Sequence, residues 1–383
     1  MIIQSRGELA TFCQRLRGAK VICIDTEFAS EGRYYAELGT IQLAAGSAIA
    51  LIDPLAVGDM SGLLAVLADP SSLKVLHAGE QDLRIFYRLL GRPITPVFDT
   101  QIAAAFLGYG DQVSLRYLVQ VSLGKVLAKD STFTDWLHRP LSPTQVEYAL
   151  NDVRYLEETH ALLEQQLRAK DRLEPAQEEF RFLESAERFL PIDERQVYLH
   201  LKGAERLKGP ALGLLQELAA WREVTARRLN LPPRRIAIDP VLLELAQRPP
   251  SSIRQLAQVR GMNGRQVGEF GAEMLEALRR GRNNTPDPIA LSEPFPPALE
   301  ATVDFLSVCL RAIAQEHSIA TATLANRSDL RELILQGDTA DTPLLRGWRR
   351  RMVGLPLLGA LQGKVAARII AATKQVQLLP ADS

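Results

Sequence analysis

A short apolar segment near the start of the chain, Lys20–Phe28 (KVICIDTEF), constrains the fold more than any other feature. Its β-branched and apolar residues predict a buried strand. Asp25 and Glu27 lie two positions apart, so both side chains point to the same face of that strand. Two carboxylates on a core strand are costly unless something neutralises their charge. The simpler alternative is a strand end that reaches solvent, with both acids hydrated.

The rest of the first 170 residues alternates between strand and helix patterns. Strands are predicted for Gly39–Ala45 and Ser47–Ile52, joined at Gly46, and for Leu73–His77. Helical spacing is found in Gln81–Leu90, Thr100–Leu107, Ser114–Val121 and Pro143–Leu167. The mixture indicates an α/β domain whose sheet begins with antiparallel strands.

The helix predicted from Pro143 has a strong start signal and carries two further polar candidates. Ser142 and Gln145 form the pattern of a capping box around Pro143. Tyr148 and Asp152 lie four positions apart and share one helical face. Amphipathic helices have many such pairs, so this one taken alone fits a solvated surface.

Two more aspartates lie at predicted helix starts. Asp82 follows the strand Leu73–His77, in a place where an acid commonly stabilises the helix dipole and its free N–H groups. Asp99 opens a helix as Asp-Thr-Gln, and we interpret it as an N-cap and not as a further metal ligand.

Strand patterns disappear in the second half of the chain. We expect a helical connector over 171–207, then two all-helical segments at 208–287 and 292–377, separated by the proline-rich stretch Arg282–Pro297. Residues 1–170 carry 16 basic and 19 acidic side chains, whereas residues 208–287 carry 13 basic and 8 acidic ones. The excess of acidic residues over 1–170 favours binding of cations, and the excess of basic residues over 208–287 favours binding of phosphates.

Composition excludes several classes of protein. The three cysteines, Cys13, Cys23 and Cys309, are far apart, so we expect neither a disulfide framework nor a zinc site, and a reducing, cytoplasmic location. The N-terminus lacks the pattern of a signal peptide, and no apolar run is long enough to cross a membrane. Gly359–Val365 lacks the Walker spacing, so we expect no use of ATP.

Taken in order, the motifs resemble a known family. The segments VICIDTEF, YYAELGTIQL, VLHAGEQDLRIF, FDTQIAA and EYALNDVRYL are similar to those of the DEDD 3′–5′ exonucleases, in the subgroup with a tyrosine in its third motif. The later segments WREVTARRLNLPPRRI and GWRRRMVG look like the C-terminal helical modules of the ribonuclease D family, the first being of the HRDC type. The resemblance implies a ribonuclease H-like α/β domain over 1–170, followed by two small all-α HRDC-like domains.

Carried over by motif, the resemblance implies that Asp25, Glu27, Asp82 and Asp152 bind two divalent ions. Carboxylate oxygens are hard ligands that suit Mg²⁺ or Mn²⁺. Tyr148 would orient the attacking water or help to deprotonate it. Because tyrosine has an unperturbed pKa of about 10, we expect loss of its hydroxyl to lower activity less than loss of a metal ligand.

Several residues are expected to contact nucleic acid. Phe28 and His77 would contact the terminal nucleotide, although His77 equally fits a hydrogen-bonded histidine at a strand end. Two basic clusters would bind phosphates, with a solvated basic face as the alternative. The clusters are Arg227, Arg228, Arg234 and Arg235 around one turn, and Arg349, Arg350 and Arg351 further on.

One departure from the family pattern concerns phosphate contacts. The family often has an arginine shortly before the Asp-Trp dipeptide, and here Thr132-Phe133-Thr134 precedes Asp135-Trp136. Such an arginine would hold substrate phosphate, so this departure concerns local substrate contacts and not the metal chemistry.

The sequence therefore predicts a metal-dependent 3′–5′ exoribonuclease that releases nucleoside 5′-monophosphates from RNA with a free 3′ end. Precursors of tRNA and other stable RNAs are the substrates that the resemblance implies. Nothing in the motifs distinguishes ribose from deoxyribose, so a DNA 3′–5′ exonuclease stays open. A non-catalytic RNA-binding protein is the third alternative, and the complete five-residue set argues against it.

Overall fold

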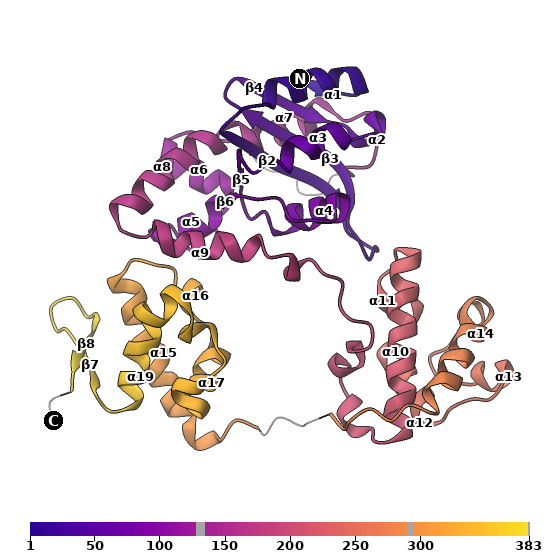
Figure 1. Cartoon of the computed structure of the whole chain (residues 1–383). Coiled ribbons are helices and arrows are strands. Elements are labelled where there is room, and N and C mark those ends of the chain that lie inside the picture. The colour runs from indigo at the N-terminus through magenta and orange to yellow at the C-terminus, as the bar shows by residue number, and fades with distance from the viewer. Residues whose placement is uncertain (128–134, 290–293, 382–383) are drawn as a thin grey trace. The chain divides into compact units, whose positions relative to one another are not determined.

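The structure is a computed structural model that describes residues 1–127, 135–289 and 294–381 (Figure 1). The chain divides into two compact units. The first comprises Met1–Glu27, Leu38–Phe189 and Phe295–Ser383, and the second comprises Phe28–Glu37 and Leu190–Pro294. Within the described residues, no helix combines the length and the apolar character needed to span a lipid bilayer.

A six-stranded sheet forms the centre of the first unit. Its strands, in spatial order, are β1 (Ile2–Ile3), β4 (Ala48–Ile52), β3 (Glu37–Ala45), β2 (Val21–Ala29), β5 (Leu73–Leu76) and β6 (Val97–Asp99). β4 is parallel to β1 and antiparallel to β3, and β5 is parallel to both β2 and β6. The predicted α/β sheet with an early antiparallel pair is confirmed, whereas the short edge strands β1 and β6 escaped prediction. β2 lies inside the sheet, with Ile22, Cys23 and Ile24 buried.

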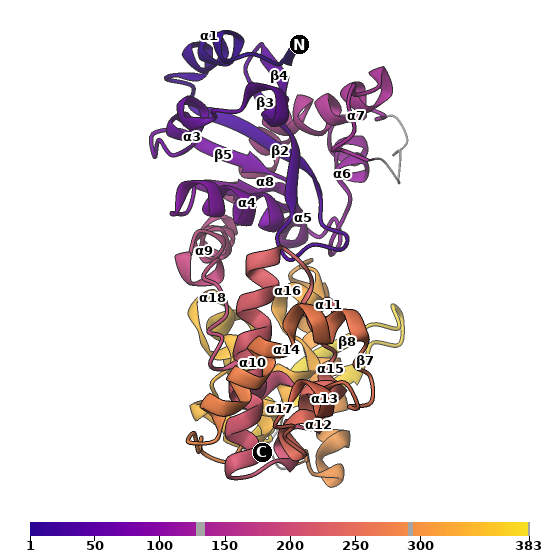
Figure 2. The ribbon, with the colours of Figure 1, turned by 90° about the vertical axis from the view of Figure 1, so that its right-hand side faces the viewer.

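Helices cover both faces of this sheet. They are α1 (Arg6–Leu16), α2 (Pro54–Val57), α3 (Ser61–Leu67), α4 (Glu80–Leu90), α5 (Thr100–Leu107), α6 (Leu115–Leu123), α7 (Pro143–Arg154), α8 (Leu156–Ala169) and α9 (Leu173–Leu183). α3 and α4 lie on one side of the sheet, and α6 and α7 lie on the other (Figure 2). α4 buries Leu83 and Phe86 at helical spacing and ends at Gly91, whose φ of 68° suits glycine.

The single helix expected over Pro143–Leu167 is two helices. α7 ends at Arg154, Tyr155 leaves the helical conformation, and α8 begins at Leu156. The predicted capping box is confirmed: Ser142 Oγ accepts from the Gln145 N–H at 3.2 Å, and the Ser142 N–H donates to Gln145 Oε1 at 2.8 Å. The break lets α7 pack against β4 while α8 packs against α5 and β5.

The C-terminal part of the first unit is helical but ends in a hairpin. It contains α15 (Glu300–Glu316), α16 (Thr321–Leu324), α17 (Arg327–Gln336), α18 (Gly347–Arg349) and α19 (Leu355–Leu361), then β7 (Val365–Ile369) antiparallel to β8 (Val376–Pro380). The expectation that no strand follows residue 171 is therefore wrong at this end. Most hairpin side chains are exposed, so the segment lacks the alternation by which a strand is recognised.

This C-terminal part packs on α9 and α5 of the same unit. Arg349 Nη1 and Nη2 donate to the two carboxylate oxygens of Glu179 at 2.6 and 3.0 Å, and Trp348 Nε1 donates to Glu179 Oε1 at 2.8 Å. The Trp348 ring meets Phe106 edge to face, with centroids 4.9 Å apart. Arg349, which the sequence grouped with phosphate-binding residues, thus has a structural partner.

The second unit is a helical module with its own hydrophobic core. Its helices are α10 (Pro210–Leu229), α11 (Pro233–Ile236), α12 (Asp239–Gln247), α13 (Ile253–Leu256) and α14 (Gly264–Gly281). The C-terminal end of α14 and the turn after it pack closely on α10. The approach leaves no room for a side chain at Gly213, where a Cβ would lie 1.7 Å from the Asn284 carbonyl oxygen. The segment Phe28–Glu37 contacts α10 and its C-cap: the Tyr34 hydroxyl donates to Glu223, and the Tyr35 N–H donates to Asn230 Oδ1 at 2.7 Å.

The Arg349–Glu179 pair should stabilise the first unit. We expect Glu179→Gln to lower the free energy of unfolding by about 1–3 kcal/mol, because a charge-assisted, two-pronged contact is lost. Thermal or urea unfolding measures this as a lower midpoint. Arg350→Gln is the matched control, since Arg350 is exposed, and equal midpoints for the two variants would contradict the structural role of the pair.

Candidate active site

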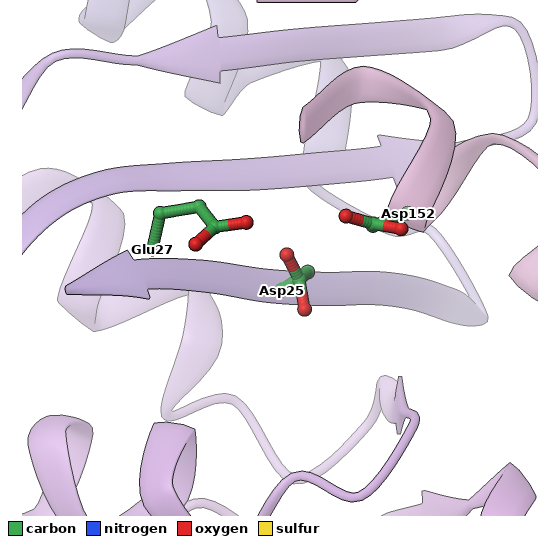
Figure 3. A group of neighbouring side chains, drawn as sticks. All are labelled: Asp25, Glu27 and Asp152. Atoms are coloured by element: carbon green, nitrogen blue, oxygen red, sulfur yellow. The ribbon is translucent and has the colours of Figure 1, made fainter. Parts of the chain in front are cut away.

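Three carboxylates from two distant segments share one space. Asp25 and Glu27 extend from the same face of β2, and Asp152 comes from the last turn of α7 (Figure 3). One oxygen from each lies within 4.8 Å of the others, and all three residues are half-buried. Because β2 is interior and α7 is anchored by its capping box, the three side chains are brought together by the core of the fold.

Asp82 lies beside this group but is not part of it. It sits in the first turn of α4, is buried, and its Oδ1 accepts a short hydrogen bond from the Thr26 hydroxyl. Its charge still reaches the group, since it contributes to raising the pKa values of Asp25 and Glu27. The structure therefore gathers Asp25, Glu27 and Asp152 and places Asp82 next to them, engaged with Thr26.

Burial and mutual repulsion set the electrostatics of the site. Loss of hydration and the charges of Asp82, Asp152 and Glu27 raise the pKa of Asp25 well above its ordinary value. Loss of hydration, Asp152 and Asp82 raise the pKa of Glu27 to about 8, and desolvation raises that of Asp82 to about 6. Each shift means that the ionised form of the carboxylate is disfavoured in these surroundings, which lack a neutralising positive charge. A divalent cation would relieve all of them at once, and hard oxygen donors suit such ions.

A buried amide that the sequence motifs did not single out supports Asp25. With its NH₂ group toward β2, Gln42 donates to the Asp25 carbonyl oxygen at 2.7 Å and to Asp25 Oδ2 at 3.3 Å, and its oxygen accepts from Thr40 Oγ1 at 2.6 Å. Gln42 and Thr40 are completely buried on β3. A polar Gln inside an apolar strand is the signal that could have identified this support.

A cavity of about 340 Å³ opens beside the carboxylates. Its walls are Asp25, Glu27, His77, Gln101, Gln112, Val113, Ser114, Leu115, Arg116, Leu127, Thr144, Glu147, Tyr148, Asn151 and Asp152. Tyr148 and Asp152 thus face the same space, as their four-residue spacing on one helix predicted. The Tyr148 ring lies 6.1 Å from that of Trp136, which is buried under it.

Arg139 anchors the segment that carries Trp136. Its Nε and Nη2 donate to the two oxygens of Asp53 at 2.7 and 2.8 Å, and further bonds reach the carbonyls of Trp136 and Gly39 at 2.8 Å each. The packing is close, since a Cβ at Gly39 would lie 2.7 Å from the Trp136 carbonyl oxygen. Trp136 therefore has a fixed position under Tyr148. The Thr132-Phe133-Thr134 segment before it lies outside the described residues.

Two residues expected to contact the terminal nucleotide have different surroundings. His77 lines the cavity, but Nδ1 lies 2.9 Å from Thr100 Oγ1 and Nε2 lies 2.9 Å from the Val113 carbonyl oxygen. Desolvation lowers the pKa of His77, so the imidazole is neutral near pH 7. Phe28 belongs to the second compact unit and is not among the described residues that line the cavity. Asp99 is an N-cap as predicted, accepting from the N–H groups of Gln101 and Ile102.

The basic residues predicted to bind phosphates divide into two groups. Arg227 is bonded to Glu223 at 3.1 Å and to the Ile192 carbonyl, and Arg228 donates to Glu273 at 3.0 Å. Arg234 and Arg235 instead line a hollow of about 550 Å³ in the second unit, beside Gly32, Leu231, Asn263, Arg265, Gln266, Glu269 and Phe270. Sequence alone does not distinguish the paired arginines from those facing a hollow.

Comparison with known proteins places the fold in a class. Residues 1–168 match the family described as 3′–5′ exonuclease, and residues 211–278 match the HRDC domain. A mixed sheet in which the inner strand β2 and the helix α7 bring carboxylates together beside a cavity agrees with this assignment. The chain is thus a 3′–5′ exonuclease with an attached HRDC domain.

Relatives that match nearly the whole chain narrow the class to one family. The chain is 36% identical to ribonuclease D of Zymomonas mobilis over 372 residues, covering 95% of each, and 36% identical to ribonuclease D of Granulibacter bethesdensis over 387 residues, covering 99% of this chain and 96% of that one. The crystal structure of Escherichia coli RNase D, an exoribonuclease involved in structured RNA processing, matches with a TM-score of 0.82 at 31% identity, covering 95% of this chain and 98% of that chain. The chain belongs to the ribonuclease D family of 3′–5′ exoribonucleases, as its motifs predicted.

The Arg139–Asp53 pair should stabilise the fold in a pH-dependent way. Burial alone would raise the pKa of Asp53, but hydrogen bonds and charge from Arg139 outweigh it, and the pKa lies below its ordinary value. The contribution of the pair is therefore present above about pH 4, the pKa of an unfolded aspartate, and is lost as the pH falls through the lower folded pKa. We expect Arg139→Gln to lower the free energy of unfolding by on the order of 3 kcal/mol near neutral pH.

Urea unfolding of wild type and Arg139→Gln across the acidic range measures this difference. It should shrink as the solution is acidified, and adding Asp53→Asn to Arg139→Gln should recover part of the loss. A difference that stays constant with pH, and no recovery in the double variant, would contradict the role given to the pair.

Proposed function

We propose that the chain hydrolyses RNA stepwise from its 3′ end to nucleoside 5′-monophosphates, using two divalent ions held by Asp25, Glu27, Asp82 and Asp152. The observation that carries the proposal is the convergence of oxygens from Asp25, Glu27 and Asp152 within 4.8 Å. Such a cluster is unfavourable without cations, as the raised pKa values of Asp25 and Glu27 indicate. Asp82, buried beside the group, is the proposed fourth ligand.

Each residue then has a distinct task. Two bound divalent ions would increase the acidity of the attacking water and stabilise the leaving oxygen. Tyr148 would hold that water through its hydroxyl, because an unperturbed tyrosine, with a pKa of about 10, is a poor base at neutral pH. Trp136 and Arg139 support the position of the Tyr148 ring. Gln42 keeps Asp25 oriented, so that its carboxylate faces Asp152.

The second unit is proposed to bind the rest of the RNA. Arg234 and Arg235 line a hollow with Arg265 and carry no ion pair with any described residue. Arginines of this kind bind phosphates without regard to sequence. Phe28 and His77 remain proposed contacts of the terminal nucleotide, with His77 acting as a neutral hydrogen-bonding group.

Stable, structured RNAs are the proposed substrates, with tRNA precursors foremost. Support comes from the near full-length match to Escherichia coli RNase D, which is described as involved in structured RNA processing.

The proposed functional parts of the chain are an exonuclease domain (1–170), a connector (171–207) and two HRDC-like domains (208–287 and 292–377). Three unpaired, buried cysteines suit the reducing cytoplasm as the place of action.

An Asp25→Asn variant tests the activity directly. We expect wild type to shorten a 3′-extended tRNA stepwise with Mg²⁺ or Mn²⁺ and to stop when a chelator is added. Asp25→Asn should lose more than the roughly 10–100-fold that removal of an outer-sphere partner costs at metal sites. Asp111→Asn is the matched control, since Asp111 is exposed and does not line the cavity.

Single-stranded DNA of the same sequence separates the alternatives in that assay. Equal attack on RNA and DNA would favour a general 3′–5′ exonuclease. RNA binding without any shortened product would favour a non-catalytic binding protein. Either outcome would overturn the proposed specificity or the proposed chemistry.

Substitution of Arg234 and Arg235 together by Gln tests the RNA-binding hollow. We expect weaker binding of tRNA and a shallower dependence of affinity on salt, because each lost phosphate contact removes up to about 0.9 from the slope of log affinity against log salt. Turnover of a short oligonucleotide should change little. Arg248→Gln is the control, since Arg248 is exposed and pairs with Glu244; equal salt slopes in all three proteins would exclude the hollow.

A further inference from the structure

The cavity beside the carboxylates is lined mainly by acidic and uncharged residues, with a single arginine among those described. Its walls carry the carboxylates of Asp25, Glu27, Glu147 and Asp152. Among the described residues that line it, Arg116 is the only lysine or arginine. RNA entering this cavity brings a negative charge at every linkage. Ions at Asp25, Glu27 and Asp152 would offset the charge at the reacting linkage, but neighbouring linkages need a cation of their own.

Arg116 has a defined place in the cavity wall. It is the second residue of α6, a helix that starts at the Ser114 cap and is fixed by the buried Leu118 and Val119. Val113, the residue before the cap, is also fixed by contacts to its carbonyl oxygen. The Val113 carbonyl oxygen accepts from Gln101 Nε2 at 3.0 Å and lies 2.9 Å from His77 Nε2. The start of α6 is therefore tied to α5 and to the end of β5 before any substrate binds.

Arg116 also differs from the arginines that hold the fold together. Arg139, Arg349 and Arg227 each bind a carboxylate from another part of the fold. Arg116 is half-buried and forms no ion pair or side-chain hydrogen bond with any residue in the described part of the chain. A guanidinium in a pocket wall, with five N–H donors and no carboxylate partner, is suited to a phosphate.

We propose that Arg116 binds a non-bridging phosphate oxygen of the RNA strand, at a linkage on the 5′ side of the one being cleaved. This inference rests on the proposed function and names a further substrate-binding residue for it. Arg116 holds the strand so that its terminal linkage lies over the carboxylate group. Its charge also offsets part of the repulsion between the acidic cavity and the incoming backbone.

The test moves a single neutral linkage along a short RNA. A methylphosphonate removes the charge of one phosphate at a time, at each of the linkages 5′ to the scissile one. Wild type, Arg116→Gln, Arg116→Lys and Arg154→Gln are compared by kcat and KM. Arg154 is the matched control, because it is exposed on the nearby α7 and does not line the cavity.

In wild type, one linkage should be sensitive, with kcat/KM falling about tenfold when it is neutral, as expected for one charge-assisted hydrogen bond. Arg116→Gln should lose about as much on unmodified RNA, mainly through KM, and should then be indifferent to that linkage. Arg116→Lys should keep part of the sensitivity. Arg154→Gln should behave as wild type.

Unchanged sensitivity in Arg116→Gln, or a KM equal to that of Arg154→Gln, would overturn the proposal. An Arg116→Gln variant whose kcat falls by the same factor on every RNA, whichever linkage is neutral, would also overturn the proposal. That result would indicate a structural role for Arg116. Failure of the proposed function is a separate outcome: wild type would then release no nucleotides from unmodified RNA at all.

Discussion

Repulsion among closely spaced, half-buried carboxylates is the constraint on which the rest of this structure depends. Asp25 and Glu27 cannot leave the sheet, because β2 is an inner strand with apolar residues on either side of the pair. Asp152 is pressed toward them by the packing of α7 on β4. The pKa values of Asp25 and Glu27 are raised because this arrangement disfavours their ionised forms. The fold keeps the carboxylates close together despite their repulsion. Bound cations would relieve this repulsion, and metal affinity is therefore coupled to folding.

Supporting contacts keep this unfavourable cluster in one geometry. Thr26 donates a hydrogen bond to Asp82, and Gln42 donates to Asp25. On the other side, the Arg139–Asp53 pair fixes Trp136 beneath Tyr148, and the Ser142 capping box fixes the start of α7. These elements come from three different parts of the chain. The site is therefore a property of the folded first unit and not of any single motif.

The sequence predicted the parts of the site that depend on local geometry. Spacings of two on a strand and four on a helix place side chains on one face whatever their surroundings, and so Asp25 with Glu27 and Tyr148 with Asp152 could be grouped in advance. Contacts between residues that are far apart in the sequence could not be predicted in this way. The Thr26 bond to Asp82 joins residues 56 positions apart, and the Arg349 pair with Glu179 spans 170. The hairpin β7–β8 was missed because its exposed residues carry no burial pattern.

Crystals grown with Mn²⁺ provide the most direct measurement, through the anomalous scattering of the metal. We expect two peaks in the pocket formed by β2 and α7, both within bonding distance of carboxylate oxygens from Asp25, Glu27 or Asp152. We also expect Asp82 to turn from Thr26 toward one of them. A pocket free of anomalous density at saturating Mn²⁺, with the ion bound elsewhere on the chain, would show that these carboxylates are not the metal site.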